Sequence, residues 1–133
     1  MGFWRISPFT NTMELYEDEF SIKETPLLYN SSSPVSMFTL LIGALPVMVQ
    51  VIIDTPFDGT APTLSIGTAG DPDKYMTTVQ VNLKGVAEDI YEVKSPVIVV
   101  AGSSEVIIAT YVADGSSVGA ARIKFHYHSE VRS

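Results

Sequence analysis

Cysteine is absent from this chain of 133 residues. Its absence excludes a disulfide framework and any metal site built on thiolates, so stability has to come from packing or from assembly with other chains. Charged residues are also scarce, at 17% of the chain against about a quarter in an average soluble domain. Because hydrophobic residues reach 46%, we expect a partner to cover part of the uncharged surface.

Long hydrophobic runs are missing too. The longest, residues 37–49, is interrupted by Gly43 and Pro46 and is shorter than the roughly 18 residues that indicate a membrane-spanning helix. The first nine residues contain Arg5 but neither a continuous apolar stretch nor a small-residue cleavage site. The sequence therefore predicts no membrane association and no secretion signal.

Positive charge is sparse and dispersed. Eight Lys and Arg residues stand singly along the chain against fifteen Asp and Glu residues, which gives a net charge of -7. Binding to a nucleic-acid backbone relies on clustered cations that displace counterions from the phosphates. No nucleic-acid partner is therefore predicted.

The composition of the chain changes near residue 33 and divides it into two parts. Residues 1–33 are acidic and interspersed with aromatic side chains, and they end at a turn-forming run of Asn, Ser and Pro. We interpret them as an N-terminal arm that becomes ordered against something else. Residues 34–133 have the length and the patterning of a single domain.

Short β-strands follow one another through this second part. Residues 47–54 are rich in β-branched side chains, and residues 119–128 alternate so that Ala121, Ile123 and Phe125 share one face. Further strands are expected at residues 63–66, 75–83, 86–93 with Ile90 buried and Tyr91 as a second candidate for burial, 96–101 and 105–112. Turns rich in Gly, Pro, Asp and Ser separate them. The pattern predicts an all-β fold, a jelly-roll-like antiparallel β-sandwich with an extended N-terminal arm.

Two histidines offer a candidate metal site. His126 and His128 are two residues apart, so a strand places both on one face, and Glu130 continues that face. Two imidazoles and a carboxylate suit zinc, which usually takes a further ligand from elsewhere. The chain has no other histidine, and we favour the alternative that these residues form a polar outer strand face.

Aspartates in two turns offer another candidate. Asp58 lies in one turn and Asp71 and Asp73 in the next, and loops at one end of a sandwich can share a cation such as calcium. The strict spacing of a calcium-binding loop is missing, and Asp beside Gly or Pro is ordinary turn chemistry. We predict no cofactor and keep these three aspartates as minor metal candidates.

No catalytic constellation is recognisable in the sequence. The serines at 31–33, 103–104 and 116–117 all lie in expected turns, and no nucleophile-elbow pattern surrounds them. Nucleophilic catalysis needs a base beside such a serine and a third group that orients the base. The sequence therefore predicts that the protein is not an enzyme.

Residues 49–76 carry a resemblance to a known family. A β-strand leads into Phe57-Asp58-Gly59, then into Leu64-Ser65-Ile66-Gly67, and finally into Gly70-Asp71-Pro72-Asp73. This order of strands and turns resembles small virion proteins of tailed bacteriophages. The likeness covers about a fifth of the chain closely and, through the strand rhythm that follows, about two thirds loosely.

The resemblance implies a capsid decoration or cement protein on the exterior of the virion head, assembled as a homotrimer and bound to the major capsid protein. In such a protein the arm would bind the shell through aromatic and apolar residues: Phe3, Trp4, Phe9, Leu15, Tyr16 and Phe20. The same residues could instead complete the domain's own sandwich. Both alternatives stay open at this point.

Two other functions are compatible with the sequence. A neck or tail component of a phage, such as a fibre-attachment or tail-completion protein, would share these features but occur in few copies. A carbohydrate-binding module would need aromatic residues lined up on a sheet face, and Tyr91, Tyr111 and Tyr127 show no common platform in the sequence. A capsid decoration protein is the function that we predict.

Overall fold

The computed structural model describes the backbone of residues 2–6, 13–95 and 103–132, and the side chains of residues 21–95 and 103–128. The elements in chain order are β1 (Gly2–Ile6), β2 (Met13–Leu28), β3 (Val35–Leu40), β4 (Leu45–Thr55), β5 (Thr63–Gly67), the 3-10 helix η1 (Thr78–Gln80), β6 (Ile90–Lys94), β7 (Glu105–Val112) and β8 (Ala120–Arg132). No helix within these ranges is long and apolar enough to cross a membrane.

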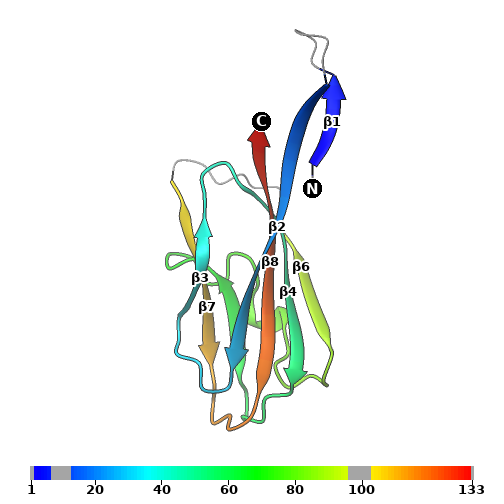
Figure 1. The fold of residues 1–133 in the computed structure, drawn as a ribbon. Coiled ribbons are helices and arrows are strands. Elements are labelled where there is room, and N and C mark those ends of the chain that lie inside the picture. Colours follow the sequence, from blue (N-terminus) through cyan, green and yellow to red (C-terminus); the bar gives the residue numbers. More distant parts are fainter. Residues whose placement is uncertain (1, 7–12, 96–102, 133) are drawn as a thin grey trace.

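Two antiparallel sheets face each other and form a sandwich (Figure 1). One sheet has the strand order β1-β2-β8-β4-β6 and the other β3-β7-β5. From β2 onward, successive strands alternate between the two sheets, which is the crossing pattern of a jelly-roll-like fold. The predicted fold class is confirmed.

β4 and β8 supply the centre of the larger sheet. Three buried residues of β4 pair in register with three buried residues of β8: Val49 with Phe125, Val51 with Ile123, and Ile53 with Ala121. Residues two apart in a strand lie on the same face, so these runs build one apolar face toward the smaller sheet. The predicted face of Ala121, Ile123 and Phe125 is confirmed, and β4 presents the matching face.

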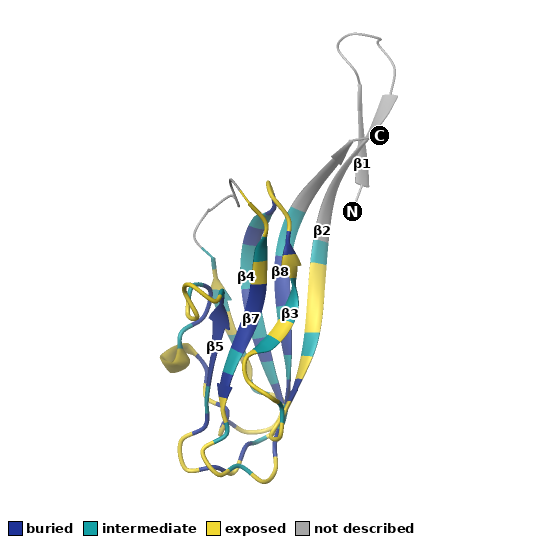
Figure 2. Ribbon diagram, turned by 90° about the vertical axis from the view of Figure 1, so that its left-hand side faces the viewer, coloured by how far each residue is buried: buried dark blue, intermediate teal, exposed yellow. Residues whose placement is uncertain are grey.

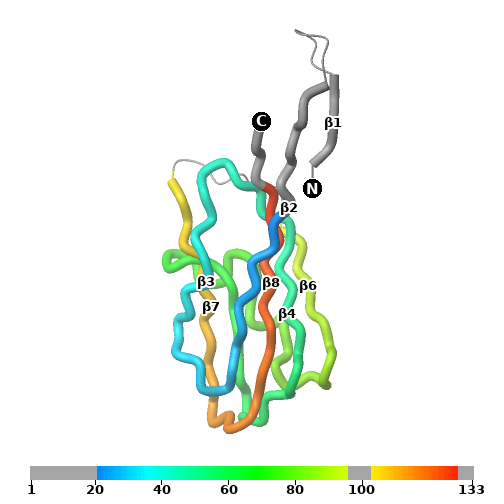
Figure 3. The backbone as a smooth tube through the Cα atoms, in the orientation of Figure 1, coloured from blue at the N-terminus to red at the C-terminus, as the bar shows by residue number. Residues whose placement is uncertain are grey.

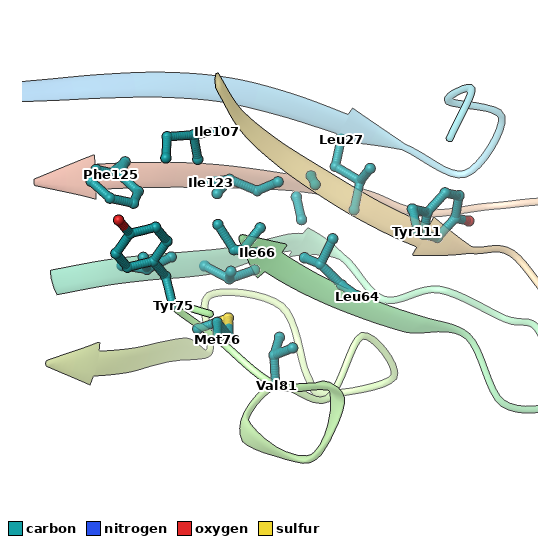
Figure 4. Close-up of a cluster of buried hydrophobic side chains, with 14 of the residues drawn as sticks. Leu27, Leu64, Ile66, Tyr75, Met76, Val81, Ile107, Tyr111, Ile123 and Phe125 are labelled. Carbon is teal, nitrogen blue, oxygen red and sulfur yellow. The ribbon is translucent and has the colours of Figure 1, made fainter. Parts of the chain in front are cut away.

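The core between the sheets is filled by aliphatic and aromatic side chains from both layers (Figure 4). Ile66 in β5 and Ile123 in β8 are fully buried there. Phe125 packs edge-on against Tyr75 and Phe38, with ring centroids 5.0 and 5.2 Å apart. Full burial of a side chain of this size contributes about 1.5–3 kcal/mol to folding, so packing in this layer stabilises the fold.

Residues 75–83 do not form the predicted strand. Tyr75 is buried beside β5, but η1 follows and leaves Val79 92% exposed. The Thr77 backbone N–H donates to Gln80 Oε1 at 2.8 Å and closes this turn. Local side-chain to backbone hydrogen bonds compete with a sheet ladder. Residues 75–83 are therefore a connection between strands. Its alternating apolar residues contact the core individually and do not form a strand face.

The next strand is shorter than predicted, and of its two candidate core residues only Tyr91 packs against the core. β6 begins at Ile90, which is 54% exposed although we predicted it to be buried. Tyr91 pairs with Val51 and packs against the core instead. A shift of one residue exchanges the two faces of a strand, which is why the pattern alone was wrong here. The strand predicted at 96–101 lies outside the described residues.

The N-terminal segment completes the domain's own sandwich in its second half. β2 pairs with β8 from residue 16 to residue 28, and Leu27 is fully buried in the core. The sandwich thus begins before residue 34, and the arm is shorter than the predicted 1–33. Pro26 is tolerated in β2 because β1 pairs only with residues 13–17, which leaves β2 as an edge strand at this position.

Beyond the sandwich, three strands continue as a ribbon (Figure 1). Pairing between β4 and β8 ends at Leu45 and His128, whereas β2 and β8 stay paired as far as Tyr16 and Arg132. β1 is added to the other edge of β2. We call residues 2–6, 13–19 and 129–132 the N-terminal ribbon. It is the extended arm of the prediction, in the form of a β-hairpin joined by the end of β8.

Candidate partner-binding surface

The hairpin of β1 and β2 brings four of the six predicted arm residues together. The register pairs Phe3 with Tyr16, Trp4 with Leu15, and, at the base of the ribbon, Phe20 with His128. Phe9 lies outside the described residues. The sequence suggested six separate anchors. In the structure, four of these residues form two adjacent cross-strand pairs, and such pairs are the units that stabilise a sheet.

The turn between β3 and β4 exposes two large apolar side chains near the base of the ribbon. Leu41 and Ile42 are 66% and 61% exposed. A backbone hydrogen bond to the Leu41 carbonyl closes the turn, and Gly43 has a φ of 84°, a value that favours glycine. Because Leu45 pairs with His128, the turn lies where β8 leaves the sandwich (Figure 3).

Leu41 and Ile42 were not among the predicted contact residues. The available signal was an apolar pair directly before a glycine in a tight connection, whereas turns are normally built from polar residues. Figure 2 shows the general pattern, with buried residues in the strands of the sandwich and exposed residues in the connections. Leu41 and Ile42 are exposed like other residues of the connections, but they are apolar, and the turn tip is therefore a candidate contact surface.

Asp58 is engaged in hydrogen bonds within the sandwich. Its carboxylate accepts from the backbone N–H groups of Ser117 at 2.7 Å and Val118 at 3.0 Å, and from the Ser117 hydroxyl at 2.8 Å. These donors favour the charged form and lower the pKa of Asp58 below its usual value. The carboxylate thus fastens the connection before β5 to the connection between β7 and β8.

Asp71 and Asp73 lie in the turn after β5. The Asp71 backbone N–H donates to the Thr68 side chain at 3.2 Å, and a hydrogen bond between the two carboxyl groups raises the pKa of Asp71. In the described part of the chain, no group of three or more His, Asp or Glu side chains is arranged to hold a metal ion. Asp58, Asp71 and Asp73 therefore have turn roles here and do not converge into such a group.

His126 lies on the outer face of β8 with Arg122 and Lys124, as predicted, but it is buried rather than exposed to solvent. It is only 6% exposed, and its Nε2 lies 3.0 Å from Gln50 Oε1. Burial, together with the nearby charge of Lys124, lowers the pKa of His126. His128 is partly buried, and the Glu130 side chain is outside the described residues.

The rest of that outer face carries paired charges. Arg122 donates to Asp54 through two nitrogens at 3.0 Å, and Glu24 lies 4.0 Å from Arg122 and 3.8 Å from Lys124. Solvent-exposed pairs of this kind contribute about 0–1 kcal/mol each. This face of β2, β8 and β4 is therefore a solvated network of charges.

The tyrosines considered for carbohydrate binding lie in separate places. Tyr111 is buried and donates to the Tyr29 carbonyl at 2.9 Å. Tyr127 stacks on Phe38 with ring centroids 5.4 Å apart, and Tyr91 is partly buried on the edge strand β6. Sugar binding on a sheet face needs rings exposed side by side, and these three rings do not provide that.

The sequence matches no protein-family model and no curated protein. Two solved structures share its fold. A chain in the capsid asymmetric unit of cyanophage Pam1 superimposes with a TM-score of 0.62 at 16% identity, over 84% of this chain and 85% of that one. A chain in the acid-stable capsid of Helicobacter pylori bacteriophage KHP30 superimposes with a TM-score of 0.57 at 16% identity, over 89% of this chain and 98% of that one.

Both likenesses extend over nearly the whole of each chain. The matched chain in each capsid is therefore similar in length to this one and has little besides the shared fold. At such low identity the comparison establishes the fold and leaves the role open. The resemblance to phage virion proteins drawn from residues 49–76 is confirmed at the level of the fold: this chain is folded like small proteins of two phage capsids.

Proposed function

We propose that this protein is a capsid decoration or cement protein, which binds the major capsid protein on the exterior of a phage head and stabilises the shell. The observation that carries the proposal is the end-to-end structural likeness to chains of similar length in two phage capsids. A neck or tail role is less favoured because both of those structures are capsids.

The division of the molecule fits such a role. The sandwich provides a rigid body, and the N-terminal ribbon, which carries Trp4 and Leu15, extends from it as an anchor. A buried aromatic or aliphatic anchor contributes on the order of 2 kcal/mol to an interface, and the gain multiplies over the many copies on a shell. A homotrimer would present three such ribbons together.

Several polar side chains of the sandwich make structural contacts, which supports a role without catalysis. Asp58 fastens two connections, and Arg122 is paired with Asp54. His126 is buried against Gln50. A general base needs access to a substrate proton, and these groups are directed at neighbours within the fold.

The test is the copy number in purified particles, measured by quantitative mass spectrometry against the major capsid protein. One copy per capsid subunit, or a simple fraction of it, is the expected result. A few copies per particle would contradict the decoration role and favour the neck or tail, and absence from particles would overturn the virion role altogether.

A further inference from the structure

The outer face of the smaller sheet carries no charged residue along its three described strands. In β7, the alternate residues Ile107, Ala109 and Tyr111 are buried in the core, so the residues between them face outward. The register with β3 and β5 places the outward residues of the three strands side by side. They are Ser36, Thr39, Thr63, Ser65, Gly67, Val106, Ile108, Thr110 and Val112, and we call them the uncharged face.

The outer face of the larger sheet is different. It carries the charged side chains Arg122, Lys124, Asp54 and Glu24. The solvated face of an antiparallel sheet is usually polar, and charges on a sheet discourage association with other sheets. The uncharged face lacks that protection, and two large apolar side chains on it, Val106 and Val112, are each 51% exposed. Of the two outer faces of the sandwich, this one therefore has the chemistry of a contact surface.

The turn after β5 covers one corner of the uncharged face. A side chain at Gly67 would collide with the backbone of Asp71 and Pro72, which shows that this turn packs directly over Gly67. The described strands form two sheets and no third layer, and the smaller sheet is turned toward the viewer in Figure 2. The charged residues of the turn therefore lie at the rim of the face, where interfaces are normally polar.

The size of the uncharged face limits the strength of a contact there. Three strands of five to eight residues present roughly 300 Å² at a strand spacing of about 4.8 Å and a rise of about 3.3 Å per residue. A standard interface buries roughly 800 Å² on each partner. We therefore expect an association through this face to be weak and to depend on protein concentration.

The charge of the whole chain indicates which partner fits this face. The net charge is -7, so two copies repel each other wherever their acidic surfaces meet, and like charges at close range cost free energy. On the uncharged face, two copies come together without that cost. A basic partner would gain nothing from a face without carboxylates and would bind elsewhere on an acidic chain.

We infer that the uncharged face of one copy packs against a second copy of this chain. Ile108 lies between Val106 and Thr110 on β7, and this row of β-branched side chains forms the centre of the contact. The inference goes beyond the proposed function, because it names one surface of the contact between copies that a homotrimer would need. It does not depend on where in the virion the protein is located.

Inserted charges in the full-length protein test the face. Val106→Glu and Thr110→Glu place a carboxylate on it and should weaken self-association at least about tenfold, because the contact would then bury an unpaired charge. Val118→Glu is the matched control, since Val118 is 48% exposed but lies in the connection between β7 and β8. It adds the same charge and should leave association within about threefold of the wild type. Sedimentation velocity over a range of protein concentrations measures all four proteins.

The absence of cysteine allows a second test. Val106→Cys and Val118→Cys each introduce the single thiol of the chain, at positions of similar exposure. The reaction of Val106→Cys with a maleimide should slow severalfold as the protein concentration rises, because association covers the thiol. The rate for Val118→Cys should stay constant.

The outcomes distinguish this inference from the proposed function. A wild type that stays monomeric at every concentration would overturn the inference while leaving the decoration role untouched. Association that persists in both glutamate variants, with the circular dichroism spectrum of the wild type, would place the contact elsewhere. Glutamate variants that bind empty heads more weakly but still self-associate would identify the shell protein as the occupant and overturn the inference. If a glutamate variant fails to fold, the labelling of Val106→Cys decides.

Discussion

β2 and β8 pass through two environments along their length. Inside the sandwich, their core-side residues, such as Leu27 and Phe125, are covered by the smaller sheet. In the N-terminal ribbon the two strands stay paired as far as Tyr16 and Arg132, beyond Leu45 and His128, where pairing between β4 and β8 ends. The same backbone pairing thus belongs to the core in one region and, as we propose, to an anchor in the other.

The comparison shows that strand pairing and the burial of apolar area contribute separately to the free energy of folding. A ladder of backbone hydrogen bonds replaces bonds to water and contributes little net free energy per bond, whereas burying apolar area needs a second layer. In the sandwich the second layer belongs to the same chain. In the ribbon, we propose, a partner supplies it. Substitutions in the sandwich should therefore change the free energy of unfolding, and substitutions in the ribbon should change binding.

The largest contrast is expected between Phe125 and Leu15. Phe125→Ala should lower the free energy of unfolding by about 3–5 kcal/mol, because the ring is fully buried between Tyr75 and Phe38 and leaves a cavity. Leu15→Ala in the ribbon should lower it by less than about 1 kcal/mol. Urea unfolding followed by circular dichroism measures both, and equal losses would show that the ribbon is part of the cooperative core.

A smaller effect is expected at Glu105 in β7, which tethers the connection after β5 to the sandwich. Its carboxylate accepts from Lys74 at 2.6 Å and from the Tyr75 hydroxyl at 2.8 Å. Burial by itself would raise the pKa of Glu105, but these two hydrogen bonds outweigh it and lower that pKa. Glu105→Gln should cost about 1–2 kcal/mol, with the lower value favoured because the pair is partly exposed.

A double-mutant cycle checks this tether. Adding Lys74→Met to Glu105→Gln should recover part of the lost stability, because the unpaired ammonium group is removed as well. Additive losses in urea unfolding would mean that the 2.6 Å pair contributes no coupling free energy. Neither variant should alter binding to empty heads, since both positions belong to the sandwich.

The smallest effect is expected at Asp58. Asp58→Asn should lower the Tm by a few degrees at pH 7, because the amide cannot accept the three hydrogen bonds from Ser117 and Val118 equally well. The folded-state pKa of Asp58 lies below the ordinary value of 3.8. Its stabilisation is therefore complete above that value and is lost as the pH falls through the folded pKa.

The pH dependence of the Tm difference checks this assignment. The gap between wild type and Asp58→Asn should be constant near neutral pH and should narrow as the pH falls below about 3.8 and through the lower folded pKa of Asp58. A gap that stays constant after the Asp58 carboxyl group of the folded protein has been protonated, as followed by NMR, would mean that its charge is not what holds the two connections together.

Much of the sandwich could be predicted because its strands have strong local patterns. Val49, Val51 and Ile53 alternate cleanly, and so do Ile123 and Phe125, so both the strands and their inward faces followed from side-chain periodicity. Ile90 and Val79 could not be placed in this way. Which residue of β6 faces inward depends on its register with β4, and η1 interrupts an alternation that looks like a strand.

The candidate site was predictable in part. The aromatic and apolar composition of the first 20 residues indicated an anchor, and the structure pairs Trp4 with Leu15 and Phe3 with Tyr16. The turn with Leu41 and Ile42 was not foreseen, because its position beside the ribbon depends on the pairing of residues 45 and 128, which are distant in sequence.

By itself, the sequence determined that this chain is an all-β protein with no thiol chemistry and with an N-terminal segment of unusual composition, because strand alternation, turn chemistry and residue counts are local properties. Only the tertiary structure decided where along β2 and β8 the core stops. Alternation along a strand determines which residues share a face, but it does not determine whether a second layer covers that face. Coverage depends on how far β3, β7 and β5 extend, and thus on pairing between residues far apart in the chain.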